Sequence, residues 1–204
     1  MTIEAWRITG QAQIDSYVER HVRRAVLLVN ELAISRARGR DVVPPATGQD
    51  RREAIQQALA TAGLPRSQSL TDSDADRLAV VALQLRPVFD PGERIEARAE
   101  GLNQLLVRHA AVPNLHGHPD GQPVLAFHRA DADLVDAWTS DAGTALAMVI
   151  GVGQAARLRS CEAGGCESVF FDTTRNASRR FCGLSCQNRA KASAYRARRA
   201  AETG

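Results

Sequence analysis

The sequence contains few aromatic residues, which make up 4% of its 204 positions. The core must therefore be built mainly from Leu, Val, Ile and Ala, a composition that favours helices. Lysine is nearly missing as well, since Lys191 stands beside 25 arginines. This bias is typical of a GC-rich coding sequence, so the arginine count alone indicates no particular function.

A secretion signal and a long apolar run are also missing. Residues 1–10 do not join a basic segment to an apolar one. The longest weakly polar run, residues 144–153, is far shorter than the roughly 20 apolar residues of a membrane-spanning helix. We therefore expect a cytoplasmic protein without contact to a membrane. With 44% hydrophobic residues, the chain can form one medium domain and a small appendage.

Apolar residues recur at helical spacing along much of the first 156 residues. The expected helices cover residues 14–38, 50–62, 71–86 or slightly beyond, 91–111 and 131–153. Thr71 is suited to cap the third helix, and Pro91 to open the fourth. The side chains expected to face inward from the fourth helix are Ile95, Leu102, Leu105 and Leu106.

A single β signal lies between the last two of these helices. Leu115 and residues 124–128 flank the loop HGHPDGQ, whose composition suits a hairpin. We therefore predict a mainly α fold, in which residues 1–156 form a helical domain with a small β-hairpin. Residues 157–204 form a second, smaller domain.

That second domain contains all four cysteines, which fall within 26 residues as CEAGGC and CGLSC. Two such pairs can place four thiolates about 2.3 Å from one zinc ion and leave no open position, as in structural sites. The expected zinc ligands are Cys161, Cys166, Cys182 and Cys186. Two disulfides, four unrelated buried thiols or an iron–sulfur cluster are the alternatives, although the spacing differs from common ferredoxin patterns.

The order of segments in this domain predicts a treble-clef-like zinc finger. Gly164 and Gly165 allow the first cysteine pair to form a zinc knuckle. Residues 168–172 and 179–181 are expected to pair as strands across TTRNAS, and the second cysteine pair then opens a helix. We expect zinc binding to drive the folding of this module, whose core is separate from that of the helical domain.

The helix after the last cysteine is strongly basic. Residues 151–204 carry ten Lys and Arg against four Asp and Glu, whereas the preceding chain carries 16 against 19. We expect Ala190, Ala194, Ala197 and Ala201 to pack on the zinc core, leaving a cationic face for nucleic acid. The candidate nucleic-acid-contacting residues are Arg179, Arg180, Asn188, Arg189, Lys191, Tyr195, Arg196, Arg198 and Arg199. The alternative is a solvated basic helix without a ligand.

The segments RLRSC, VFFDTTRN, SRRFC and CQNRAKASAYRARR resemble the CGNR-type zinc finger of bacterial transcription regulators. The segment LLVN at residues 27–30 is similar to a signature of the helical stress-response (ABATE-like) domain that precedes this finger. The resemblance implies a DNA-binding transcription regulator whose first domain senses a small molecule or forms a homodimer. Gln187 stands where the family has a glycine after the last cysteine. Its side chain occupies space that a glycine would leave free, so the resemblance does not imply a close approach of DNA to this backbone.

Other polar residues have a structural and a functional interpretation. His109, His116, His118 and His128 crowd one stretch and could hold a second metal, although loop histidines usually do not. Asn30 is expected to satisfy a neighbouring backbone group, and contact with a ligand is the alternative. Neither a P-loop nor a GxSxG motif nor a Cys–His nucleophile occurs, so we do not expect an enzyme. The alternative to DNA binding is a zinc-stabilised protein-interaction module.

Overall fold

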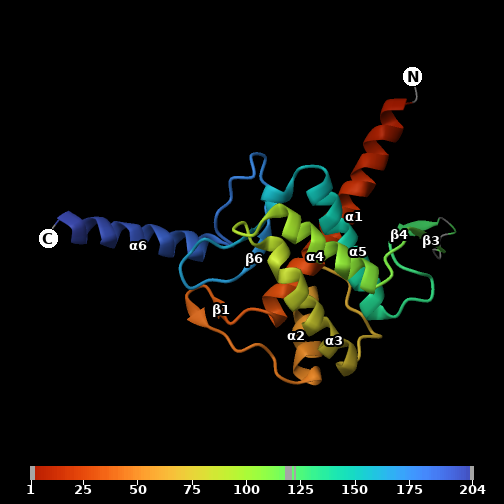
Figure 1. The fold of residues 1–204 in the computed structure, drawn as a ribbon, viewed down its shortest axis with the longest axis horizontal. Helices are drawn as coiled ribbons and strands as arrows, with labels where there is room; N and C mark the ends of the chain where they lie inside the picture. Colours follow the sequence, from red (N-terminus) through yellow and green to blue (C-terminus); the bar gives the residue numbers. More distant parts are fainter. Residues whose placement is uncertain (1–2, 118–120, 122, 203–204) are drawn as a thin grey trace.

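The computed structural model describes residues 3–117, 121 and 123–202, and side chains from Ser16 onward (Figure 1). The described chain is mainly helical with small two-stranded antiparallel sheets, as the sequence predicts. The helices are α1 (Ile3–Leu32), α2 (Gly48–Thr61), α3 (Asp72–Leu85), α4 (Ile95–Arg108), α5 (Leu134–Gly151) and α6 (Leu184–Glu202). None of the helices in this part of the chain has the length and apolarity needed to cross a bilayer.

The strands form three hairpin-like pairs in the described residues. These are β1 (Arg36–Ala37) with β2 (Arg40–Asp41), β3 (Asn114–His116) with β4 (Val124–Ala126), and β5 (Leu158–Ser160) with β6 (Val169–Phe171). Short 3-10 helices at Arg86–Phe89 (η1) and Ala155–Arg157 (η2) join longer elements. The pairing of Leu115 with Leu125 confirms the expected β3–β4 hairpin.

Side-chain caps fix where several helices begin. Thr71 accepts the backbone N–H of Asp74, whose carboxylate accepts the N–H of Thr71, so the predicted cap is confirmed as a capping box. Thr47 and Asp133 cap α2 and α5 through a single hydrogen bond each. Local sequence therefore determines these boundaries.

The core surrounds α1, which contacts α2, α3, α5 and strand β6. Val22, Ala25, Leu28 and Val29 lie on the inner side of α1 and are fully buried. Figure 1 shows that the N-terminal end of α1 and most of α6 extend away from this body. Burial of aliphatic side chains around one central helix stabilises the fold, at about 25 cal/mol for each Å² of apolar surface removed from water.

The predicted end of the first helix is wrong by six residues. Helix α1 ends at Leu32, and residues 36–41 form the β1–β2 hairpin instead of a further helical turn. The hairpin turn docks on the first cysteine pair, where the N–H of Gly39 donates to the carbonyl of Gly165 (2.9 Å). These distant backbone contacts outweigh local helix propensity.

The fourth helix also differs from its prediction. It begins at Ile95, four residues after Pro91, and Ile95 is 40% exposed. Leu102 and Leu105 are buried as expected, whereas the buried Arg98 was not predicted. Its guanidinium Nε donates to the carbonyl of Val88 (2.8 Å), so the charge is accommodated by backbone oxygen atoms.

The expected separation of two cores holds only in part, because Cys161, Ala163, Cys166 and Cys186 form a small buried cluster of their own, whereas β5 and β6 join the main core. Leu158 and Val169, which belong to β5 and β6, lie in the same buried cluster as the residues of α1. Asn30 of α1 reinforces this contact, because its side-chain amide donates to the carbonyl of Val169 (3.0 Å) and its Oδ1 accepts the N–H of Val169 (2.8 Å). The structural interpretation of Asn30 is thus confirmed, and the zinc module rests directly on the helical part.

Candidate metal centre

The loop between β5 and β6 carries the first cysteine pair. Leu158 pairs with Phe171 and Ser160 with Val169, so the two strands hold the ends of this loop together. The predicted pairing of residues 168–172 with 179–181 is wrong, because β6 takes β5 as its partner. Residues 179–181 instead lie beside the knuckle, where the carbonyl of Arg180 accepts the N–H of Glu162 (3.0 Å).

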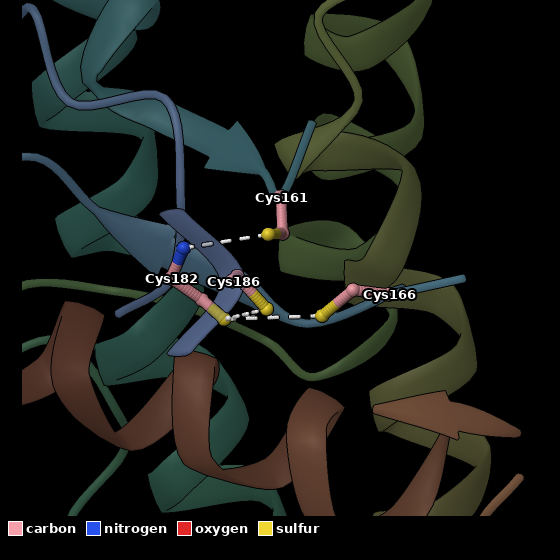
Figure 2. Close-up of side chains that lie close together, drawn as sticks. All are labelled: Cys161, Cys166, Cys182 and Cys186. Carbon is pink, nitrogen blue, oxygen red and sulfur yellow. Dashed lines mark hydrogen bonds between the residues drawn. The ribbon is translucent and has the colours of Figure 1, made fainter. Parts of the chain in front are cut away.

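The second cysteine pair is positioned by the start of α6. Cys182 precedes the helix and Cys186 lies in its first turn, where unsatisfied N–H groups favour negative charge. Figure 2 shows the sulfur atoms of all four cysteines close together, with Cys161 and Cys166 from the β5–β6 loop, Cys182 from just before α6 and Cys186 from its first turn. The knuckle loop and the start of α6, which the sequence predicts as the carriers of the cysteines, therefore bring the four thiols together.

The distances between sulfur atoms fit a tetrahedral site. The four Sγ atoms all lie within 4.8 Å of one another. Cys182 Sγ is 3.8 Å from Cys166 Sγ and 3.6 Å from Cys186 Sγ. A tetrahedron with zinc–sulfur bonds of about 2.3 Å has edges of about 3.8 Å. A disulfide would need about 2.05 Å, and all four cysteines are free.

Hydrogen bonds to sulfur support the thiolate form. The N–H of Arg38 donates to Cys166 Sγ (3.4 Å), and the N–H of Cys182 donates to Cys161 Sγ (3.4 Å). Burial raises the pKa of Cys166, but hydrogen bonds from Ser168 and Arg38 outweigh this effect and lower it to about 6. Burial raises the pKa of Cys182 and of Cys186. A divalent ion is what allows four adjacent thiols to be deprotonated together.

Asp172 holds the loop that follows β6. This carboxylate is fully buried, and it accepts the N–H of Thr174 (2.8 Å) and the N–H of Arg179 (2.7 Å). Burial raises its pKa, yet the hydrogen bonds from Thr174 and Arg179 outweigh burial and leave the pKa below its ordinary value. The residue after β6 is therefore an ionised carboxylate, and its hydrogen bonds organise the chain that leads to Cys182.

Glu167 links the zinc knuckle to the helical part. Its carboxylate accepts the N–H of Ser35 (2.9 Å) and lies 3.4 Å from a guanidinium nitrogen of Arg86. The Ser35 N–H is the main cause that lowers the pKa of Glu167, against the effect of burial, and Arg86 lowers it further. Sequence reasoning missed Ser35, Arg86 and Glu167, because nothing local connects residues more than 80 positions apart.

Three of the predicted nucleic-acid contacts are engaged inside the module. Arg179 donates to the carbonyls of Phe181 and Cys182 and stacks over Phe170. Arg180 Nε is 2.5 Å from a carboxylate oxygen of Glu162. Arg189 donates to the carbonyl of Gly164 (2.8 Å), and its other terminal nitrogen is buried. Arg179 and Arg189 are thus partly buried in the module, whereas the side chain of Arg180 is 65% exposed and pairs with Glu162 at the surface.

The remaining candidates lie on the exposed part of α6. They are Asn188, Lys191, Tyr195, Arg196, Arg198 and Arg199. All residues from 191 to 200 are exposed, so the expected packing of the alanine stripe on the zinc core is wrong beyond Ala190. The zinc core is too short to cover the helix, and α6 continues past it into solvent (Figure 1).

The histidines do not gather into a second metal site in the described residues. His109 Nδ1 lies 2.7 Å from a carboxylate oxygen of Asp136, and the rings of His116 and His128 are 4.4 Å apart. His118 lies outside the described residues. The described histidines are thus paired or stacked with neighbouring side chains. These contacts agree with a structural role and not with a metal site.

Comparison with known families identifies the module. Residues 157–199 match the family model of the CGNR zinc finger, which covers all four cysteines and most of α6. No curated protein matches the chain with significance. The match and the sulfur geometry together define a four-cysteine zinc finger, and zinc is the ion that this ligand set fits.

Proposed function

We propose that the chain is a zinc-dependent DNA-binding protein that regulates transcription, and that α6 is its principal contact with DNA. The exposure of α6 is the observation that carries the proposal. Its residues 191–200 are all exposed, and the helix leaves the body of the protein (Figure 1). Ten helical residues measure about 15 Å, enough to lie across a major groove about 12 Å wide.

The exposed part of α6 carries a high density of positive charge. Within the described residues, no hydrogen bond or ion pair engages the side chains of Lys191, Arg196 and Arg198. Arg199 lies 6.0 Å from the ring centroid of Tyr195, a pair that suits contact with phosphate and with a sugar or base. This surface supports binding to a polyanion.

In this proposal the zinc ion has a structural role. Cys182 and Cys186 hold the first turn of α6, and Cys161 and Cys166 tie that turn to β5 and β6. Loss of the ion would release α6 from its fixed direction, because a four-thiolate site without metal is unfavourable. For the helical part, the proposal includes binding of a small-molecule effector and formation of a homodimer. It also includes a cytoplasmic location for the whole protein.

A protein-interaction module is the competing function, favoured by the exposed alanines of α6. Ala194 and Ala197 are uncovered, and small side chains permit close packing of a partner helix. Such a partner would not need the arginines of the same helix. The two functions therefore differ in their dependence on salt and on those arginines.

Fluorescence anisotropy with a labelled pool of duplex DNA tests the proposal. Zinc-loaded protein should bind at about 50 mM salt and weaken steeply as salt rises, because bound phosphates release counterions. Arg196→Ala/Arg198→Ala should lower the slope of log affinity against log salt by about two units. The matched control is Arg66→Ala/Arg108→Ala, which removes two exposed arginines from the helical part. Absence of binding, or equal binding by both variants, would favour the interaction module.

A further inference from the structure

The β1–β2 hairpin carries three alternate arginines, Arg36, Arg38 and Arg40. Its turn consists of Arg38 and Gly39, with φ angles of 54° and 81°. Left-handed backbone is usual for glycine but unfavourable for arginine, so surrounding contacts must hold it. Those contacts are hydrogen bonds from the N–H of Arg38 to Cys166 Sγ and from the N–H of Gly39 to Gly165.

The side chains of Arg38 and Arg40 do not take part in stabilising the fold. Arg36 lies 3.4 Å from Glu167, but within the described residues no hydrogen bond or ion pair engages the guanidinium groups of Arg38 and Arg40. Both residues are exposed. The backbone of the hairpin thus anchors it to the zinc knuckle, while two positive charges face solvent.

The hairpin turn also touches the base of α6. The guanidinium of Arg189 lies directly against Gly39, since a Cβ atom there would be 2.1 Å from its Cζ. A groove of about 990 Å³ lies between α1, the hairpin, β6 and the base of α6. Its polar lining includes Arg38, Arg40, Arg179 and Arg189, with Glu31 and Asp41 as the acidic groups, so positive charge predominates.

The hairpin arginines are the exposed arginines of this lining, whereas Arg179 and Arg189 are partly buried. Arg179 and Arg189 already donate to backbone carbonyls. Arg38 and Arg40 therefore extend the positive surface of α6 from its base onto the helical part of the chain.

The spacing of these charges suits a DNA duplex. Arg189 marks where the hairpin meets α6, and Arg198 lies nine residues farther along, at about 14 Å by helix geometry. A major groove is about 12 Å wide. The part of α6 between these two positions is therefore long enough to cross one groove, with the hairpin beside its base.

We propose that the β1–β2 hairpin is a second DNA-contacting element, in which Arg38 and Arg40 bind backbone phosphates beside those bound by α6. This inference rests on the proposed function of α6. It assigns the helical part a direct role in DNA binding, since the hairpin belongs to that part. The hairpin contributes affinity and register rather than base recognition, because phosphate contacts carry no direct sequence information.

The experiment compares Arg38→Ala/Arg40→Ala with Arg196→Ala/Arg198→Ala and the control Arg66→Ala/Arg108→Ala in the full zinc-loaded chain. Each variant removes two positive charges. The probe is a duplex of random sequence about 20 base pairs long, titrated at several salt concentrations. The hairpin variant should bind on the order of tenfold or more weakly at about 50 mM salt, with a salt slope lower by about two units. Its zinc content and melting temperature should equal those of wild type.

The outcomes separate this inference from the proposed function. If the α6 variant binds weakly and the hairpin variant binds like the control, α6 contacts DNA without the hairpin and the inference is overturned. If wild type does not bind, both fall. Should the hairpin variant lose zinc, Arg38→Lys/Arg40→Lys decides the matter: unlike alanine, it keeps the charge, so recovery of binding with unchanged zinc content supports the inference, and failure to recover overturns it.

Discussion

The arginines at the base of the zinc module and those farther along α6 have opposite environments. Arg179 and Arg189 donate to backbone carbonyls beside the cysteines, whereas Arg196 and Arg198 are exposed. The same residue type thus stabilises the fold in one region and supplies surface charge in the other. Positive charge in the sequence is therefore informative about a partner only after the structurally engaged arginines have been set aside.

The largest expected effect comes from breaking the zinc site at the base. Cys182→Ser should weaken zinc binding, so that after dialysis against a chelator its zinc content falls well below the one ion per chain of wild type, because one of four thiolate ligands is lost. Because Leu158 and Val169 share the main core, the variant should also lower the melting temperature of the helical part. Metal analysis and thermal unfolding by circular dichroism measure both.

Ser185→Ala is the control for this variant, because Ser185 is an exposed neighbour of Cys186 in the same helix. It should keep its zinc and its melting temperature. Unchanged stability of the helical part in Cys182→Ser would contradict the shared core and restore the picture of two independent units.

The next effect concerns the contact between α1 and β6. Asn30→Ala leaves the N–H and carbonyl of the buried Val169 without their partners. We expect a loss of about 2–6 kcal/mol in the free energy of unfolding, since each of the two buried unsatisfied groups costs about 1–3 kcal/mol. Urea denaturation gives the value, with Asn103→Ala on the exposed side of α4 as the control. A difference below about 0.5 kcal/mol between the two variants would show that this contact is dispensable.

The contribution of Asp172 to stability is expected to depend on pH. The pKa of Asp172 is lowered in the folded state, so its contribution to stability is present above the unfolded pKa and is lost as pH falls through the folded pKa. Asp172→Asn should therefore be less stable than wild type by about 1–3 kcal/mol at neutral pH, because a buried charged hydrogen-bond acceptor is lost. Denaturation at neutral and acidic pH should show the difference shrinking with acidity. A constant difference would argue against an ionised Asp172.

The smallest effects on stability separate Arg189 from Arg196. Arg189→Ala removes a hydrogen bond to Gly164 and packing against Gly39, so it should lower stability by about 1–2 kcal/mol. Arg196→Ala should change stability by less than about 0.5 kcal/mol and lower the salt slope of DNA binding by about one unit. Thermal melts and anisotropy report the two quantities. Equal stability of the two variants would remove the distinction between base and surface.

Local sequence signals predicted the cap at Thr71 and the four ligands, because capping and paired ligand spacing act over a few residues. They did not predict the end of α1 at Leu32. That end depends on Gly39 meeting Gly165, a contact between segments more than 120 residues apart. Tertiary contacts of this kind override local propensity.

The same limit explains the two errors in the zinc module. Strand β6 is three residues long, and its pairing with β5 rather than with residues 179–181 depends on closure of the knuckle between them. The alanine periodicity of α6 predicted a buried stripe, but periodicity does not show how far the neighbouring core extends. Only the first part of α6 has a core beside it.

X-ray absorption at the zinc edge of the purified chain tests the central account most directly, because it measures the ligands of the ion itself. The account predicts one zinc per chain with four sulfur neighbours at about 2.3 Å. Nitrogen or oxygen neighbours in place of sulfur, iron in place of zinc, or a metal content near zero would contradict it.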